Sequence, residues 1–362
     1  MTDVADSDDN GQVVTEMYCD VLVIGAGFAG TIIGNMFSQQ GKDVSVIDIG
    51  KGDNNHFAIM RFRDPQVGRP LGVNLRDVLV EKAVYWNHQI HYHADIRMKN
   101  SYSLKTYGSL GYRSLGELGV VKRYLIDGKF SRYRHTMWDC SPTEFGETNG
   151  MHWCSFDANQ SYRNTDPSIV ERVCCYYKYC VSTIPLPKLA ELLPDISFPG
   201  KEFRATPIYV TRIKLNDNVH SKVNQTIYFP EDSFSAYRVS LEENTLIIES
   251  VEPEVHTVTP SDADELTEIL GAFGLSKCQI GQHLMAGPFT QRLGKLSDVD
   301  DNVRRKVIYN ITDKHSIFSL GRFAIWKPIR ADQLIEDAEK VLRMINMGMD
   351  RFAYVRRLRG GE

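Results

Sequence analysis

Three glycines and one carboxylate near the start of the chain have the residue types and spacing that bind a dinucleotide. Gly25, Gly27 and Gly30 follow an apolar run at GxGxxG spacing, and Asp48 ends the next apolar run. Gly25 permits a tight turn, and Gly27 lets the backbone approach a pyrophosphate closely. A helix that begins at this turn aims its N–H groups at the phosphates, and Asp48 would accept a hydrogen bond from a ribose hydroxyl.

The residues around these glycines predict the elements that hold them in place. Residues 21–24 and 44–47 are apolar and rich in Val and Ile, which predicts two buried strands joined by a helix. Gly30 and Gly34 lie one turn apart on that helix, so we expect both to permit close packing on the sheet. Phe28 and Ala29, in its first turn, are further candidate cofactor contacts. The order strand, glycine turn, helix, strand and acid predicts a nucleotide-binding βαβ unit.

Composition is that of an ordinary globular protein. The 362 residues are 42% hydrophobic and 24% charged with a net charge of −4, so the whole molecule is not built to coat nucleic acid. The longest apolar stretch is interrupted by four glycines, and residues 1–15 are acidic and polar, unlike a signal peptide. We therefore expect a disordered tail over 1–15, a cytoplasmic location and no membrane partner.

The cysteines and histidines favour neither disulfides nor a metal site. Seven cysteines, an odd number without a CxxC pair, indicate reduced thiols. Cys174 and Cys175 are adjacent, but they fall in a segment that has the pattern of a buried strand. His88, His91 and His93 cluster without a Cys or carboxylate placed to complete a zinc site. We expect no metal.

Periodicity predicts further elements along the chain. Four β-rich runs follow one another between residues 208 and 251 with polar turns between them, which favours an antiparallel meander. The other predicted elements are a helix over 74–88, a strand over 176–184 that ends at Pro185, a helix from about Pro187, a helix over 261–273 capped by Ser261, a strand over 316–320 and a helix over 331–347.

A basic, tyrosine-rich stretch over residues 97–135 is the strongest indication of a substrate. Its nine cations face two acids, Glu117 and Asp127, and five tyrosines are interleaved. Arginine forks bind phosphate and aromatic faces stack on bases, so the stretch favours a phosphate-bearing small molecule, a nucleotide conjugate or a nucleic-acid base. The alternative is a solvated face paired to acids elsewhere. The cations are Arg97, Lys99, Lys105, Arg113, Lys122, Arg123, Lys129, Arg132 and Arg134.

The end of the chain resembles FAD enzymes of the glutathione-reductase-like fold, above all UDP-galactopyranose mutase and the amine-oxidase superfamily. The matching stretch is LGRFAIWKPIRADQLIEDA, residues 320–338, and STIPLPKL and IYFPEDSFSAYRV are also similar. The resemblance implies FAD as cofactor. It places Gly321, Arg322 and Asp332 at the flavin side of the dinucleotide, where Arg322 would neutralise negative charge and Asp332 would accept a hydrogen bond.

The same resemblance implies an α/β fold with two parts. A Rossmann-like FAD-binding domain would be built from the discontinuous segments 16–70, 165–206 and 300–350. An α+β substrate domain with an antiparallel sheet would take 71–164 and 207–299. Asp48 by itself favours NAD, whereas Gly34 and the late Gly-Arg return favour FAD. The sequence has no second GxGxxG for a separate nicotinamide domain.

Candidate substrate contacts come from the substrate domain and from the Gly-Arg stretch. Arg238 lies in mid-strand and must face solvent or a cleft unless it is paired, and the resemblance implies a role at a substrate diphosphate. Tyr228 and Tyr237 could flank such a cleft, although tyrosines in sheets are more often core residues. Trp326, near the position of a substrate-side tyrosine in the mutases, and Arg113 complete the set. No catalytic residue is assigned.

Together these observations predict an FAD-dependent enzyme, an oxidoreductase or a flavin-mediated isomerase, acting on a phosphate-bearing and nucleotide-linked substrate. Three alternatives stay open. They are an FAD-dependent oxidase of amines or amino groups, a flavoenzyme that modifies a nucleic-acid base, and a non-catalytic flavin-bound scaffold.

Overall fold

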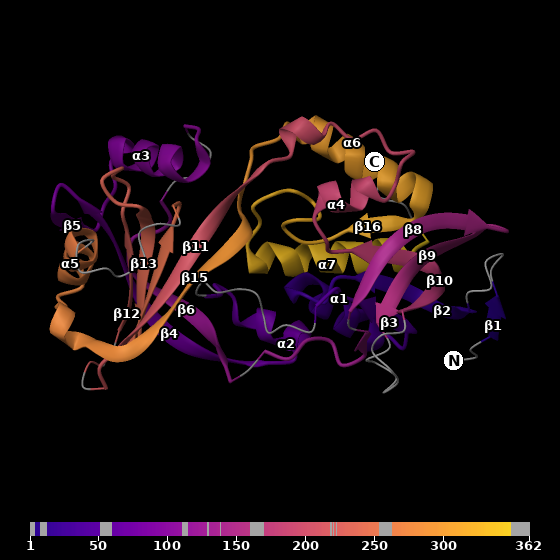
Figure 1. Ribbon diagram of the computed structural model, residues 1–362, viewed down its shortest axis with the longest axis horizontal. Coiled ribbons are helices and arrows are strands. Elements are labelled where there is room, and N and C mark those ends of the chain that lie inside the picture. The colour runs from indigo at the N-terminus through magenta and orange to yellow at the C-terminus, as the bar shows by residue number, and fades with distance from the viewer. Residues whose placement is uncertain are drawn as a thin grey trace, which may run out of the picture.

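The computed structural model describes residues 4–7, 13–50, 60–110, 115–128, 130–137, 139–159, 170–217, 219, 221, 223–252 and 263–348. Two sheets lie at opposite ends of an elongated molecule (Figure 1). We call them sheet A, at the right of Figure 1, and sheet B, at the left. The long strands β11 (Ala205–Leu215) and β15 (Ile280–Leu296) run from one part toward the other. Arg113 and the predicted cap Ser261 lie outside the described residues.

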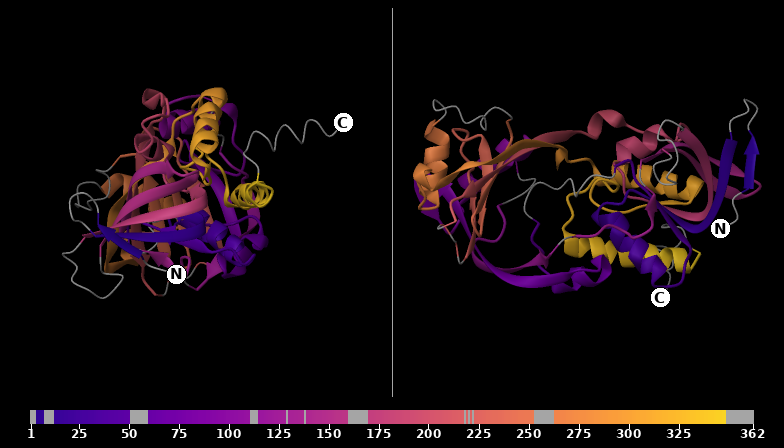
Figure 2. Two further views of the ribbon diagram at one scale, coloured as in Figure 1. Left: turned by 90° about the vertical axis from the view of Figure 1, so that its right-hand side faces the viewer. Right: turned by 60° about the horizontal axis from the view of Figure 1, so that its bottom comes forward.

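Sheet A has a parallel centre with an antiparallel extension. Five strands run parallel in the order β7 (Thr136–Met137), β3 (Val44–Ile47), β2 (Val13–Ile24), β10 (Val170–Ser182) and β16 (Ile317–Ser319). The first half of β10 pairs antiparallel with β9 (Met151–Asn159), and β9 pairs with β8 (Cys140–Thr148). β1 (Val4–Ser7) pairs with the beginning of β2 at the far end of the sheet (Figure 2).

Helices cover both faces of the parallel strands because these strands are apolar on both faces. Val21 and Val23 of β2 pack on the side of α1 (Phe28–Ser38) and α7 (Ala331–Asn346). Leu22 and Ile24 of the same strand pack on the side of α4 (Leu186–Glu191) and α6 (Asp301–His315). This three-layer arrangement brings the amino-terminal motif and the end of the chain together.

Sheet B is largely antiparallel. Its order is β15–β11–β14–β13–β12–β4–β5, with β6 on the free half of β4, and only β12 and β4 run parallel. α5 (Ala263–Ala272) packs on one face and α3 (Ile96–Tyr107) on the other. The remaining strands are β4 (Asn74–Trp86), β5 (Gln89–His91), β6 (Gly119–Asp127), β12 (Asn224–Tyr228), β13 (Ala236–Glu242) and β14 (Thr245–Ser250). Short helices occupy Pro65–Val67, Gly68–Leu71, Gly200–Glu202 and Lys277–Gln279.

Several predicted elements are confirmed, and one is wrong. Residues 176–182 of the strand predicted over 176–184 belong to β10, and α4, α5, β16 and α7 occupy the segments predicted for them. The segment 74–88, predicted as a helix, is the strand β4. Val78 and Val80 are buried while Leu79 between them is 55% exposed, so the strand alternates, but its exposed leucine hides that alternation in the sequence.

Chain connections also differ from the expected ones. β12, β13 and β14 form the predicted meander, but β11 pairs with β14 and β15 instead of β12. Residues 136–159 belong to sheet A, although the expected substrate domain included them. Residues 4–7, expected within a disordered tail, form β1. None of the helices among the described residues is long and apolar enough to cross a membrane.

The close approach of α1 to the glycine turn gives a first prediction. A Cβ on Gly30 would lie 1.8 Å from the carbonyl oxygen of Gly25, which is backbone and cannot move aside cheaply. Gly30→Ala should therefore destabilise the protein by about 2 kcal/mol or more. Gly271→Ala is the control, because a Cβ there meets nothing within 4 Å, and it should be neutral or stabilise by up to about 1 kcal/mol. Denaturant midpoints would measure both, and equal midpoints would contradict this packing.

Candidate functional site

The glycine turn between β2 and α1 has a backbone conformation and a packing that require glycine. Gly25 has a φ of +97°, and a Cβ there would lie 2.4 Å from Thr183 Oγ1. That hydroxyl donates to the carbonyls of Ile24 and Gly25, at 2.9 and 3.1 Å. A Cβ on Gly27 would meet nothing within 4 Å, and no side chain caps the first turn of α1. The turn therefore presents helix N–H groups beside open space, as an anion site requires.

Gly34 has a different role from the predicted one. A Cβ at this position would lie 3.1 Å from the ring of Tyr133, so Gly34 makes room for a side chain rather than for the sheet. The Tyr133 hydroxyl hydrogen-bonds Ser38 on the same helix. Tyr133, counted in the basic stretch as an aromatic face for substrate, is 7% exposed and packs against α1.

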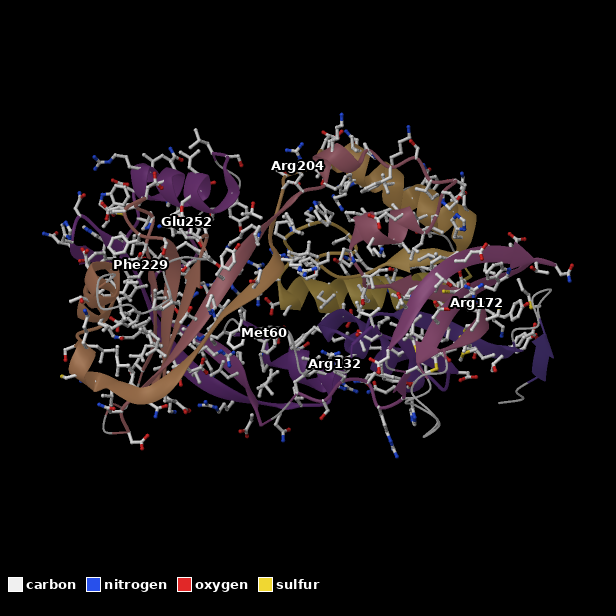
Figure 3. The ribbon with its side chains drawn as sticks, in the orientation of Figure 1. Met60, Arg132, Arg172, Arg204, Phe229 and Glu252 are labelled. Atoms are coloured by element: carbon white, nitrogen blue, oxygen red, sulfur yellow. The ribbon has the colours of Figure 1, made fainter. Side chains whose placement is uncertain are left out.

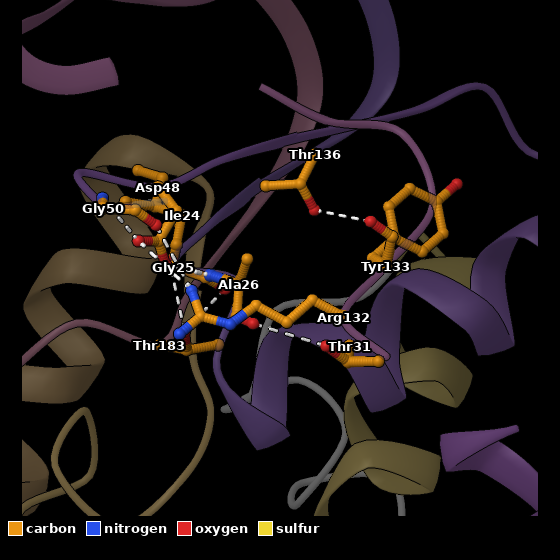
Figure 4. Close-up of polar contacts among 10 residues, drawn as sticks. All are labelled: Ile24, Gly25, Ala26, Thr31, Asp48, Gly50, Arg132, Tyr133, Thr136 and Thr183. Carbon is orange, nitrogen blue, oxygen red and sulfur yellow. Dashed lines mark hydrogen bonds and ion pairs between the residues drawn. The ribbon is translucent and has the colours of Figure 1, made fainter. Parts of the chain in front are cut away.

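Asp48 lies at the end of β3, where its carboxylate spans the turn (Figure 4). Its Oδ2 accepts from the N–H of Ala26 at 2.6 Å, and its Oδ1 accepts from the N–H of Gly50 at 2.9 Å. Its side chain is 16% exposed. The acid that the spacing singled out therefore lies against the glycine turn.

Arg132 is a residue of this corner that the motif analysis missed. Its Nη1 lies 3.4 Å from the carbonyl oxygen of Gly50 and 3.9 Å from Asp48 Oδ1 (Figure 4). From the sequence, Arg132 is predicted only as one of the nine cations in the basic stretch over residues 97–135. Arg132 precedes β7, which begins at Thr136 and pairs in parallel with β3, and its long side chain reaches the residues that follow β3. A cation thus lies beside the glycine turn.

The Gly-Arg return meets the same turn from the other end of the chain. Gly321 has a φ of +95°, and a Cβ there would lie 2.9 Å from the Cβ of Ala29. Arg322 donates from Nη2 to the carbonyl of Gly294 at 2.7 Å, which joins the return to β15. Asp332 lies in the first turn of α7, and its Oδ1 is buried without a hydrogen-bond partner among the described residues. The structure therefore brings together the two ends of the predicted cofactor site.

Arg238 lies on sheet B opposite Tyr228, but a buried acid binds it. Its Nη2 donates to Glu249 Oε1 at 2.6 Å, and its Nε donates to the other carboxylate oxygen. Glu249 is 3% exposed and also accepts from the Tyr237 hydroxyl at 3.2 Å. Burial alone would lower the pKa of Arg238, but Glu249 raises it well above its ordinary value. The charge of Arg238 is therefore already balanced within the fold.

The other candidate substrate residues have structural surroundings. Tyr237 has no exposed surface, and Tyr228 is 7% exposed and packs edge to face with Tyr102 at 5.6 Å. Trp326 is 3% exposed and packs edge to face with Phe203 at 5.8 Å. It belongs to the core of sheet A, so the structure does not bring it together with the tyrosines of sheet B.

The basic stretch is not one surface. Lys105, on α3, donates to the carbonyls of Phe229, Glu231 and Ala236 at 2.6–2.9 Å, and burial lowers its pKa to about 8. It fastens the helix to sheet B. Other cations of the stretch pair with acids, as the alternative reading anticipated. These pairs are Arg97 with Asp95, Lys122 with Asp77, and Arg123 with Glu117.

Comparison with known proteins identifies the fold. No family model and no curated protein matches the sequence. Among solved structures, reduced UDP-galactopyranose mutase matches with a TM-score of 0.62 at 13% identity, over 90% of this chain and 94% of the mutase. The chain has a flavoprotein fold. This confirms the predicted fold class and the resemblance on which it rested.

Two further structures have the same flavoprotein fold. A flavoprotein/dehydrogenase from Cytophaga hutchinsonii matches with a TM-score of 0.51 at 12% identity, over 92% of this chain and 80% of its own. Aklavinone-11 hydroxylase, in complex with FAD and aklavinone, matches with a TM-score of 0.53 at 10% identity, over 90% of this chain and 62% of its own. At such identities the likeness is one of fold.

The Arg238–Glu249 pair gives a second prediction. Arg238→Ala would leave the Glu249 carboxylate buried without its ion-pair partner, so we expect it to destabilise the protein by about 3–5 kcal/mol. Arg76→Ala is the matched control, because its ion pair with Glu243 is exposed and should contribute at most about 1 kcal/mol. Thermal and denaturant unfolding of both variants would test this. An Arg238→Ala variant as stable as the control would show that the buried Glu249 carboxylate does not depend on this ion pair.

Proposed function

We propose that this protein is an FAD-dependent enzyme, an oxidoreductase or a flavin-mediated isomerase, that acts on a phosphate-bearing, nucleotide-linked substrate. One observation carries the proposal. The glycine turn, Asp48 and the Gly321–Arg322 return converge at one place. Asp48 accepts from the N–H of Ala26 in the turn, and a Cβ on Gly321 would lie 2.9 Å from the Cβ of Ala29. They do so in a chain whose fold matches reduced UDP-galactopyranose mutase over nearly its whole length.

The residues present fit a flavin dinucleotide. The open space at Gly27 accommodates a pyrophosphate against the first turn of α1. Asp332 Oδ1 is a buried acceptor without a partner among the described residues, and a buried acceptor in that state favours a ligand with a hydroxyl or an N–H. The bound flavin would supply hydride or nucleophilic chemistry at its ring. The name of aklavinone-11 hydroxylase supports the redox branch, and that of the mutase supports isomerisation.

The chain's own residues would position the cofactor and balance its charge. The N-terminus of α1 and the Arg132 guanidinium would face the pyrophosphate from two sides. Asp48 would accept a hydrogen bond from the ribose while it also accepts from the N–H of Ala26 in the turn. Arg322 would fix the flavin side relative to sheet B through Gly294. These roles bind and orient the cofactor, and they leave the chemistry to its ring.

Cofactor retention gives a third prediction. The protein should purify yellow, with FAD released on denaturation at about one per chain. Gly27→Val should abolish retention, because the side chain fills the space of the pyrophosphate. Gly271→Val, which also adds its side chain where a Cβ meets nothing within 4 Å, should retain FAD. The absorbance spectrum of released flavin per polypeptide measures both. A colourless wild type that refuses FAD and binds NAD would exclude the proposal.

The reaction type is open to direct measurement on the loaded protein. Hydrogen peroxide release with a reduced substrate would mark an oxidase. Turnover that requires dithionite but consumes no net reductant would mark an isomerase, in which reduced flavin ends unchanged. Salt-sensitive binding of short oligonucleotides would instead favour the nucleic-acid alternative. A change in the flavin spectrum on addition of nucleotide sugars would support the proposed substrate class.

A further inference from the structure

Two cations meet at one position of sheet B. The backbone of Phe62 bridges Tyr124 of β6 through two hydrogen bonds of 2.9 Å, which fixes the preceding Arg61 beside the sheet. Arg61 Nη1 donates to Thr226 Oγ1 at 2.6 Å. Lys82 of β4 is paired in register with the same Thr226. Met60, the residue before Arg61, lies in the middle of the molecule, between the two sheets (Figure 3).

Neither cation has an acidic contact among the residues that the structure describes. Arg61 Nε and Nη2 are buried and have no hydrogen-bond partner there. Its single bond goes to a hydroxyl that also contacts Ser240 Oγ at 2.9 Å. Lys82 makes neither a hydrogen bond nor an ion pair with the described residues. A buried guanidinium in that state is costly unless something else supplies acceptors.

The neighbouring charged residues that the structure describes do not supply the acid that Arg61 and Lys82 lack. Arg238 is balanced by Glu249 and Arg123 by Glu117, so these acids are already engaged. Burial, together with the charges of Arg123 and Arg238, lowers the pKa of Lys82 to about 7. Burial is also the main reason that the pKa of Arg61 falls to about 10, although the charge of Glu242 opposes the fall. Burial and the neighbouring cations therefore disfavour the charged forms of Arg61 and Lys82, and a bound anion would stabilise these charged forms.

We infer that Arg61 and Lys82 form an anion-binding site for a phosphate group of the substrate. The inference rests on the proposed function. A phosphate dianion accepts from an arginine fork and from an ammonium together, and it balances two charges at once. Arg61 Nε and Nη2 are buried, so the site suits a small anion rather than a nucleic-acid backbone. The assignment moves the phosphate contact from Arg238, whose charge Glu249 balances, to two residues outside the predicted set.

The test is binding of inorganic pyrophosphate to the FAD-loaded protein, measured by calorimetry. Loading with FAD first fills the glycine turn, which would otherwise bind the same probe. Arg61→Gln and Lys82→Gln should each weaken pyrophosphate binding about tenfold or more, with FAD content unchanged. Arg61→Lys and Lys82→Arg, which keep the charges, should retain most of the binding and serve if a glutamine variant fails to fold. Arg76→Gln, also on β4 but exposed and paired with Glu243, should bind like wild type.

Each outcome bears on one claim. Loaded wild type that does not bind pyrophosphate, or glutamine variants that bind it like wild type, would overturn the anion site and leave the flavin proposal standing. A site that FAD itself blocks belongs to the cofactor, and this also overturns the inference. If the protein takes no FAD, the proposed function fails on its own. Pyrophosphate binding that persists in Gly27→Val and disappears when Lys82→Gln is added would still establish the site.

Discussion

The glycine turn of this molecule depends on close contacts at two glycines where a side chain would not fit. Gly30 lies against the carbonyl of Gly25, and Gly321 lies against Ala29. The first contact sets how closely α1 approaches β2, and the second sets where the returning chain meets α1. Asp48 and Arg132 then reach the same turn because β3 lies beside β2 in the sheet and β7 lies beside β3. Remove the close contacts, and the polar groups lose their common point.

Several cations of this protein that could have bound a ligand are already balanced by acids or carbonyls within the fold. Lys105 binds three carbonyls, and Arg238 is held by Glu249 and Arg123 by Glu117. The abundance of cations along a sequence therefore says little about a binding surface. The informative cations are those that the fold buries and leaves without an acid.

Sequence predicted what local patterns encode and missed what sheet register decides. Residues 21–48 carry a complete strand, turn, helix and strand, so their fold and the position of Asp48 followed directly. The partner of Arg238 depends on pairing between β13 and β14, where a bulge between residues 236 and 238 shifts the register. The place of Arg132 depends on a parallel pair between segments far apart in sequence. No spacing rule within the chain reveals either contact.

The bond from Arg322 to the carbonyl of Gly294 connects the two ends of the molecule mechanically. At Gly294 the strand β15 passes so close to Ile208 of β11 that a Cβ would lie 2.6 Å from its side chain. The two long strands are thus closely paired, and they connect sheet B with the Gly-Arg return. A substitution that moves β15 near Gly294 would therefore disturb the Arg322 contact while leaving the glycine turn itself unaltered.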